Sequence, residues 1–413
     1  MEHRGFDLED RLATLEKHEQ RRTLSPVDRV AERGYFAEPS GGGLPVLESE
    51  EALVFASDNY LGLTDDQRVQ DAARQAAATV GTGAGSSRPV TGDTMVHHDL
   101  ERLLAETKST DRSLTFSSGY AASIGAITAL EPDVVFVDER TRASLIDGCR
   151  LTDCETVAYD HRDPSSLRSE METRAEHVEV STDGGPRTDA GAHESWLIAT
   201  DSVFEADGSV APLSELADVA GEFGAWLLVD ESDATGLYAD GGGIVQADGL
   251  EERVHVQVGT FSKALASQGG YVAGSDALIE CLISEARPFL SSAGLAPPSA
   301  AAASEALHLA RHTDLRERLW NNVAHLRDGL KTMGFDAPGD SQILPLAVED
   351  RSDARLLVQG LRDRGVVASL LGHSVTSGDE TRVRIAPMAS HDEADIVTCL
   401  EAFRTVGEDV GLL

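Results

Sequence analysis

One lysine in this chain lies where reactivity, rather than charge, would explain the choice of residue. The 413 residues contain only four lysines, and Lys263 occurs in a small, glycine-rich stretch, residues 259–270, that follows an apolar run. A lysine amine can lose its proton and attack a carbonyl carbon, whereas the guanidinium of arginine cannot. The spacing therefore predicts a nucleophilic amine at Lys263. The other three, Lys17, Lys108 and Lys331, occupy amphipathic helical patterns, and we interpret them as solvated surface residues.

Ser118, Gly119 and Tyr120 form a candidate anion site. They stand where an apolar run, residues 113–116, gives way to a helical pattern. The first N–H groups of a helix have no partner within the helix, and the helix dipole favours a negative group beside them, so a phosphate fits there. Such junctions are also common turns, so this feature carries weight only together with others.

Asp230 ends the apolar run 226–229 and supplies a third element. A carboxylate at the end of a buried strand can pair with the protonated nitrogen of a pyridine ring, although alone it would be interpreted as a cap of the next helix. Lys263 follows one crossover later, with Thr260 on the same turn. The sequence therefore predicts a pyridoxal 5'-phosphate site, because it offers, in this order, an anion cradle, a partner for a ring nitrogen and a reactive amine.

The elements that must position these residues alternate between strands and helices. Short apolar runs separated by helical periodicity predict an α/β fold with a largely parallel sheet that is covered on both faces. The expected strands are residues 113–116, 134–137, 156–159, 196–200, 226–229, 254–258 and 271–273, and the expected helices include 95–108, 120–130, 165–176 and 213–223.

The order of the elements divides the chain into an arm and two domains. We expect an N-terminal arm over residues 1–51, with a charged amphipathic helix in residues 7–22, and a large α/β domain over residues 52–290 with a polar surface loop at 181–194. Residues 291–413 are expected to form a smaller C-terminal α+β domain, because the pattern changes to helices at 299–312 and 315–333 and short strands at 343–348, 366–370 and 383–385.

The composition limits the classes of partner. Thirty-five basic and 71 acidic residues give a net charge of −36, so general electrostatic binding to nucleic acid or to an anionic membrane is not expected. Acidity spread over the whole length, with arginine preferred to lysine, indicates a halophilic protein from a high-salt interior. Without a signal-peptide pattern or a long apolar stretch, the chain is expected to be cytoplasmic. The four cysteines lack metal-ligand spacing, and no metal is expected.

Several short motifs carry a resemblance to a known family. They are Ser57-Asp-Asn-Tyr-Leu-Gly-Leu63, Gly83-Ala-Gly-Ser-Ser-Arg88, Ser118-Gly-Tyr-Ala-Ala122, Ala143-Ser-Leu-Ile-Asp-Gly148, Val229-Asp-Glu231 and Gly259-Thr-Phe-Ser-Lys263. In combination, over about residues 7 to 405, the chain resembles the α-oxoamine synthases. The resemblance implies a pyridoxal-phosphate-dependent transferase of fold type I, a homodimer with sites between subunits, and decarboxylative condensation of an amino acid with an acyl-CoA. L-alanine with a pimeloyl thioester, as in biotin synthesis, is the most concrete pair that it implies.

The resemblance also implies roles for individual residues. Lys263 would carry the cofactor covalently and transfer protons, and Asp230 would pair with the pyridine nitrogen. By motif match, the phosphate would be held by Ser118, Gly119, Tyr120 and Thr260, the substrate carboxylate would be bound by Arg384, and Asn59 and Arg22 would approach the substrate. The role of Arg384 is physically coherent, because a guanidinium offers a planar, two-pronged donor to a carboxylate.

Three cofactor neighbours differ from the pattern of the family. Arg142 and Asp233 stand where the family has histidines, and Glu205 stands where it has serine. Because two carboxylates arrive with one guanidinium, we hypothesise that Arg142 covers the ring face or bridges Glu205 and Asp233. Without this compensation, the two anions would raise the pKa of the linkage between lysine and cofactor. The substrate loop of the family is also replaced, by residues 372–378.

Two other functions stay open. A related enzyme that uses another pair, such as glycine with acetyl-CoA, is compatible with the replaced substrate loop. A catalytically attenuated paralogue that binds the cofactor and serves as a dimer partner is compatible with the altered ring neighbours. Retention of Lys263 argues against this second alternative, because a chain freed from catalysis has no need for the amine.

Overall fold

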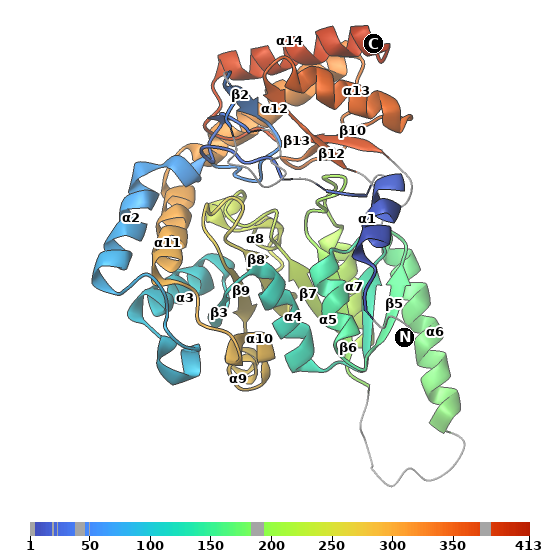
Figure 1. The fold of residues 1–413 in the computed structure, drawn as a ribbon. Coiled ribbons are helices and arrows are strands. Elements are labelled where there is room, and N and C mark those ends of the chain that lie inside the picture. The colour runs from blue at the N-terminus through green and yellow to red at the C-terminus, as the bar shows by residue number, and fades with distance from the viewer. Residues whose placement is uncertain are drawn as a thin grey trace.

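A seven-stranded sheet forms the centre of the larger part of the molecule (Figure 1). The computed structural model describes residues 5–18, 20–22, 24–37, 46–48, 50–182, 194–371 and 381–413, without the side chains of residues 177–182. Across the sheet the strands follow the order β3 (Arg112–Phe116), β9 (Gly270–Gly274), β8 (Val256–Thr260), β7 (Trp226–Asp230), β6 (Trp196–Asp201), β4 (Val134–Asp138) and β5 (Glu155–Tyr159). β9 runs antiparallel to both neighbours, and the other pairs are parallel.

Helices cover both faces of this sheet because its strands are apolar on both sides. In β4, Val135 and Val137 belong to one buried cluster, while Val134 and Phe136 belong to the other. Alternate residues of a strand point to opposite faces, so the sheet separates two cores. The helices of this part are α2 (Gln67–Thr79), α3 (Met95–Lys108), α4 (Gly119–Leu130), α5 (Ala143–Arg150), α6 (Pro164–Thr182), α7 (Leu213–Phe223), α8 (Ile244–Ala247), α9 (Asp276–Glu285) and α10 (Arg287–Leu290).

A smaller part, at the top of Figure 1, contains two three-stranded sheets. One has the order β10 (Leu344–Ala347), β13 (Arg382–Ile385) and β12 (Ser369–Leu371), and the other has the order β1 (Arg33–Gly34), β2 (Ala52–Val54) and β11 (Val366–Val367). Its helices are α12 (Leu315–Met333), α13 (Arg351–Arg362) and α14 (Glu393–Val410).

Two elements near the expected domain boundaries pack across them. β2, at the expected start of the large domain, pairs with β11, whose residues belong to the C-terminal part. α11 (Pro297–His312), after the expected end of the large domain, packs against α2 and α3. Around residues 52 and 297, therefore, β2 packs with the smaller part and α11 packs with the larger part. The order of elements along the sequence carries no signal for such tertiary pairing.

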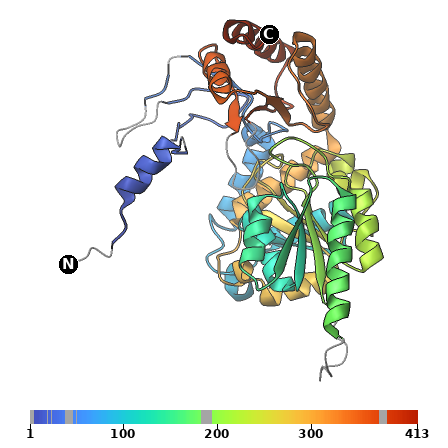
Figure 2. The same cartoon turned by 90° about the vertical axis from the view of Figure 1, so that its right-hand side faces the viewer.

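α1 (Leu8–Lys17) is the one described helix of the N-terminal arm. Asp7 caps it by accepting a hydrogen bond from the N–H of Asp10, and none of its residues is buried. α1 overlaps the large part in Figure 1, but Figure 2 shows that it stands away from the rest of the molecule. An amphipathic helix without a partner leaves its apolar stripe open to another surface.

The predicted elements are confirmed, with differences at their ends. The helix expected in residues 7–22 covers only Leu8–Lys17, and the strand expected at 366–370 is divided into β11 and β12, which belong to different sheets. Of the loop expected at 181–194, residues 183–193 lie outside the described residues. No helix in the described ranges combines the length and apolarity needed to cross a membrane.

The prediction that Lys108 is a solvated surface residue is wrong. Its side chain is fully buried, and its Nζ lies 2.7 Å from Oε2 of Glu231. Lys108 follows Leu100 and Leu104 at four-residue intervals, so the helical period itself places it on the buried face of α3. The carboxylate that makes its burial possible comes from the far end of β7, which local sequence cannot show. Lys17 and Lys331 are exposed, as predicted.

Candidate cofactor and substrate site

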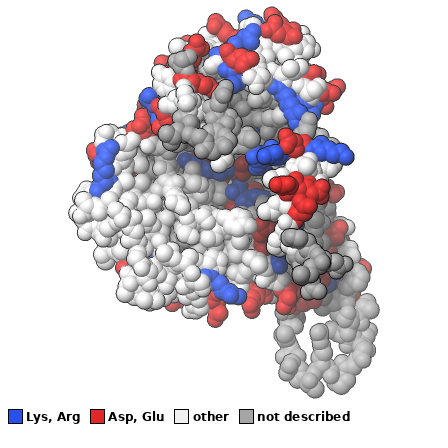
Figure 3. Space-filling view, viewed as in Figure 1, with Lys and Arg blue, Asp and Glu red and all other residues white. Residues whose placement is uncertain are grey.

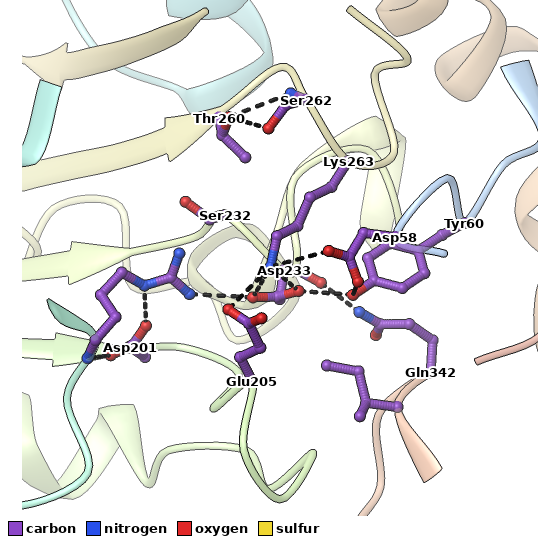
Figure 4. Close-up of polar contacts among 12 residues, drawn as sticks. Asp58, Tyr60, Asp201, Glu205, Ser232, Asp233, Thr260, Ser262, Lys263 and Gln342 are labelled. Atoms are coloured by element: carbon purple, nitrogen blue, oxygen red, sulfur yellow. Dashed lines mark hydrogen bonds and ion pairs between the residues drawn. The ribbon is translucent and has the colours of Figure 1, made fainter. Parts of the chain in front are cut away.

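The residues predicted to do chemistry gather at the carboxyl ends of the parallel strands (Figure 4). Asp230 is the last residue of β7, and Lys263 follows the end of β8 by three residues. Arg142 precedes α5, which follows β4. The carboxyl ends of parallel strands meet at one edge of a sheet, and this topology brings together residues that are far apart in the chain.

Lys263 is surrounded by carboxylates. Its Nζ lies 2.7 and 2.8 Å from the two oxygens of Asp233, 3.5 Å from Glu205 and 3.9 Å from Asp58. Burial opposes the charged ammonium, but Asp233, followed by Asp58 and Glu205, outweighs it and raises the pKa of Lys263. Without cofactor, the amine is therefore held in its protonated form. Its side chain remains 11% exposed, so solvent still reaches it.

Asp233 is the centre of this group. Besides Lys263, its carboxylate accepts hydrogen bonds from Arg142 at 3.0 Å and from the hydroxyl of Tyr60 at 2.7 Å. Burial alone would raise the pKa of Asp233, but Lys263 and Arg142 together hold it well below its usual range. The backbone carbonyl of Asp233 accepts a further hydrogen bond, from Gln342 at 2.6 Å. Asp233 is thus a fixed anion beside the reactive amine.

Arg142 joins three carboxylates. Its Nε donates to Asp201, one terminal nitrogen lies 3.3 Å from Asp230, and the other contacts Asp233. Burial opposes the charge, yet the carboxylates of Asp201 and Asp230 raise the pKa of Arg142 well above its ordinary value. Of the two carboxylates in the bridging hypothesis, Arg142 contacts Asp233, while Glu205 contacts Lys263 instead.

Asp230 keeps the capacity to accept one more hydrogen bond. One oxygen accepts from the N–H of Ser232 at 2.8 Å and also faces Arg142, and the other accepts from the hydroxyl of Ser123 at 3.3 Å. An ionised carboxylate has about four acceptor sites. A protonated ring nitrogen can therefore still pair with Asp230.

The predicted anion cradle is formed by the first turn of α4 and the end of β8. The N–H of Ala122 makes the first bond of the helix, to the carbonyl of Ser118, so the N–H groups of Gly119 and Tyr120 precede the hydrogen-bonded turn. A Cβ on Gly119 would lie 2.9 Å from the Cβ of Thr260, so only glycine lets α4 approach this strand so closely. The hydroxyl of Thr260 donates to the carbonyl of Gly269, and the hydroxyl of Ser262, 2.8 Å from that of Thr260, can supply a further donor.

These residues fit pyridoxal phosphate. The cradle supplies N–H groups, hydroxyls and a helix N-terminus for the phosphate, Asp230 supplies an acceptor for the ring nitrogen, and Lys263 supplies the amine. Tyr120 contributes its backbone, because its side chain is half exposed and its hydroxyl donates to Asp147.

The three residues predicted to meet the substrate lie in different places. Arg384, in β13, is buried and points its guanidinium at Asp58, 2.6 Å away, and at the hydroxyl of Tyr60, 3.1 Å away. Asn59 is buried and donates to Thr64, while its side-chain oxygen has no partner among the described residues. Arg22 is exposed in the coil after α1, within the arm that stands apart in Figure 2. The structure thus brings Arg384, but not Arg22, to Lys263.

Three residues of the site were missed by the sequence analysis. Asp201 ends β6 just as Asp230 ends β7, so the strand-end signal used for Asp230 was available for it as well. Asp58 and Tyr60 flank Asn59, but their importance depends on the approach of β13 from the smaller part of the molecule. The motif over residues 57–63, which carries part of the family resemblance, contains both residues, but nothing local to it shows that they meet Arg384.

Comparisons with known proteins find relatives along almost the whole chain. Residues 50–403 match the family model described as aminotransferase class I and II. An 8-amino-7-oxononanoate synthase of Geobacter metallireducens is 38% identical over 381 residues, covering 91% of this chain and 93% of that protein, and 8-amino-7-oxononanoate synthase 2 of Bacillus subtilis is 33% identical over 400 residues, covering 94% and 97%. Among solved structures, a serine palmitoyltransferase from S. paucimobilis with a bound PLP–myriocin adduct has a TM-score of 0.85 and 27% identity, with 98% of each chain covered.

Proposed function

We propose that this chain forms 8-amino-7-oxononanoate in biotin synthesis. The chain belongs to the aminotransferase class I and II family and, within it, to the pyridoxal-phosphate-dependent α-oxoamine synthases. In this reaction the α-carbon of L-alanine forms a bond to the acyl carbon of pimeloyl-CoA. The thioester bond breaks with release of CoA, and the carboxylate of alanine leaves as carbon dioxide. The enzyme class and the cofactor follow from the family, whereas the substrate pair is the proposal.

One observation carries the catalytic part of the proposal. Lys263 lies on the turn after β8, the strand in which Val258 pairs with Asp230 of β7 and Thr260 packs against Gly119 of the cradle. Pyridoxal phosphate, when bound, accepts electrons from the α-carbon of an attached amino acid. Asp230 would pair with the ring nitrogen, the cradle would hold the phosphate, and the amine of Lys263 would take the proton from the α-carbon. Arg384 orients the carboxylate of the amino acid.

The surface supports a homodimer as the acting form. Figure 3 shows a broad face of the larger part, around α3, α4 and α10, with few charged side chains, although the chain has a net charge of −36. Val90, shortly before α3, and Met95, the first residue of α3, are 71% and 73% exposed. Apolar side chains on an uncharged face favour burial against a second copy, and the unpartnered α1 provides an arm that can reach it.

The oligomeric state can be tested by light scattering after gel filtration. We expect the wild-type chain to elute as a dimer, and a Val90→Asp, Met95→Glu variant to shift toward the monomer. A matched control is Val397→Asp, another exposed apolar residue, which lies on α14 in the smaller part. A wild-type monomer would contradict the dimer.

The substrate pair can be tested by turnover. The purified protein, loaded with pyridoxal phosphate, is given L-alanine, glycine or L-serine, each with pimeloyl-CoA, acetyl-CoA or palmitoyl-CoA, and the products are identified by mass spectrometry. The proposal expects 8-amino-7-oxononanoate and free CoA from alanine with pimeloyl-CoA at the highest kcat/KM. Higher kcat/KM with another pair would overturn the biotin assignment and leave the reaction class intact.

A second candidate pair is serine with a palmitoyl thioester. The serine palmitoyltransferase structure aligns over 98% of both chains at 27% identity, so the assay above includes L-serine with palmitoyl-CoA. The attenuated paralogue predicts no turnover with any pair. The retained Lys263 and Asp230 favour the enzyme.

A further inference from the structure

Asp58 lies beside the amine of Lys263 (Figure 4), and it also contacts Arg384, the arginine proposed to bind the substrate carboxylate. One of its oxygens lies 2.6 Å from a terminal nitrogen of Arg384, and the other lies 3.9 Å from Nζ of Lys263. Tyr60 lies beside it, with its hydroxyl 3.3 Å from Asp58. A carboxylate of the chain itself thus bridges the two groups that an amino acid must reach together.

This position coincides with the one that a substrate carboxylate needs. An amino acid bound through its nitrogen near Lys263 has its carboxylate only two bonds away, and Arg384 is the guanidinium placed to receive it. Both carboxylates would compete for the same donor, because one terminal nitrogen of Arg384 already serves Asp58 and Tyr60. The Nε of Arg384 is buried and has no partner among the described residues, so the guanidinium is not saturated.

Asp58 is less enclosed than Arg384. The side chain of Asp58 is 31% exposed, and that of Arg384 is 5% exposed. Arg384 is also held by its place in β13, opposite Pro345 of β10, and by the hydroxyl of Tyr60. Loss of the Asp58 contact would therefore leave the guanidinium in place with its donors free.

We propose that Asp58 is a specificity-determining residue that competes with the substrate carboxylate for Arg384. The proposal rests on the proposed function, since it assumes an amino-acid substrate at Lys263. An entering carboxylate must displace Asp58 and leave a second anion near Lys263, so amino-acid binding is weakened. An amine without a carboxylate does not displace Asp58 from Arg384 and is not weakened in this way.

The test is a binding titration rather than a turnover assay. Wild type, Asp58→Asn and Asp65→Asn, all loaded with pyridoxal phosphate, are titrated with L-alanine and with ethylamine, and the dissociation constant is read from the absorbance of the bound cofactor. Asparagine keeps the shape of Asp58 and removes its charge. Asp65→Asn is the matched control, because Asp65 is exposed in the same segment and accepts a hydrogen bond from Gln70.

We expect Asp58→Asn to bind L-alanine about tenfold more tightly than wild type, because a competing charge on Arg384 is removed. Binding of ethylamine, and both titrations of the Asp65→Asn control, should stay within about twofold of wild type. Equal or weaker alanine binding by Asp58→Asn would overturn the inference and assign Asp58 to support of Arg384. If no amino acid changes the spectrum of the loaded wild type, the proposed function fails and the inference fails with it.

Discussion

Two lysines, the fully buried Lys108 in α3 and the partly buried Lys263 after β8, each pair with a carboxylate that follows β7. Lys108 and its partner Glu231 are both fully enclosed, at 0% exposure, and the second oxygen of Glu231 is already taken by the N–H of Val245. Lys263 keeps 11% exposure and has three carboxylates between 2.7 and 3.9 Å.

The difference shows that burial alone does not identify a reactive lysine. Lys108 has a single ionic partner within the described residues and no route to an incoming molecule, so its charge can only stabilise the fold. Lys263 has three carboxylate neighbours, Asp233, Glu205 and Asp58, and its side chain is still reached by solvent. Access and alternative partners, rather than depth, therefore separate the chemical lysine from the structural one.

The largest expected effect comes from removing the chemical lysine. Lys263→Ala should lower kcat about a thousandfold or more, because both covalent attachment and proton transfer are lost. Its free energy of unfolding in cofactor-free form should change much less than that of a Lys108 variant. Steady-state kinetics and urea denaturation measure the two quantities. If the kcat of Lys263→Ala stayed within tenfold of wild type, the catalytic role of Lys263 would be contradicted.

Removing the structural lysine should act on stability. Lys108→Met leaves the Glu231 carboxylate buried without its partner, and the free energy of unfolding should fall by about 3–5 kcal/mol in urea denaturation. The double variant Lys108→Met, Glu231→Gln should recover part of this loss, because no unpaired charge remains. Lys17→Met, in the exposed α1, is the control and should stay within about 0.5 kcal/mol of wild type. An unchanged stability of Lys108→Met would refute the structural role.

The carboxylates around Lys263 should set the pH at which the cofactor is captured. Capture requires the neutral amine, and the pKa of Lys263 is raised by its neighbours, so the capture rate should increase with pH through this raised value. Asp233→Asn removes the strongest of these neighbours and should move the midpoint down by about one unit or more. Glu205→Gln should move it less, because Glu205 lies at 3.5 Å and is half exposed. Stopped-flow absorbance at different pH values measures both midpoints. Equal shifts would contradict the order of the contacts.

The ion pair between Lys263 and Asp233 should also affect the stability of the cofactor-free protein. The pKa of Lys263 is raised above its ordinary value of 10.5, so its contribution is complete below that pH and is lost as pH rises through the raised pKa. The pKa of Asp233 is lowered from 3.8, so its contribution is complete above that pH and is lost as pH falls through the lowered pKa. Thermal unfolding scans of wild type and Asp233→Asn should therefore differ most between about pH 4 and pH 10. If the difference in unfolding temperature between the two proteins stayed the same below and above this pH range, the directions given for the two pKa shifts would be contradicted.

The smallest expected effect concerns salt. Raising KCl from 0.1 to 1 M should raise the midpoint of thermal unfolding, because the screening length falls from about 10 to 3 Å and the surface carries a net charge of −36. The difference in unfolding free energy between wild type and Lys108→Met should stay within about 0.5 kcal/mol over this range, since an enclosed pair is screened little. A large salt dependence of that difference would show that water reaches the Lys108 pair.

Much of the fold could be predicted from sequence, because its signals are local. The apolar runs and helical periods of the large part gave most strands and helices, and the position of Lys263 after a strand indicated its chemistry without any tertiary information. The expected domain boundaries at residues 52 and 291 were harder to place, because β2 and α11 find their partners across them.

The environment of the site was harder to predict than its members. Lys263, Asp230 and Gly119 stand at strand and helix ends, and the parallel topology brings such ends together. Two contacts of the site join segments more than 50 residues apart in the chain. They are the hydrogen bond from Arg142 to Asp201 and the one from Arg384 to Asp58. Charge pairs of this kind leave no periodic pattern.

The covalent role of Lys263 is tested most directly by trapping the cofactor on the protein. The holoenzyme is reduced with borohydride and digested, and the peptide that carries the pyridoxyl group is identified by mass spectrometry. The account predicts the label on Lys263, with none on Lys108, Lys17 or Lys331. A label on another lysine, or a loaded protein that cannot be labelled, would contradict it.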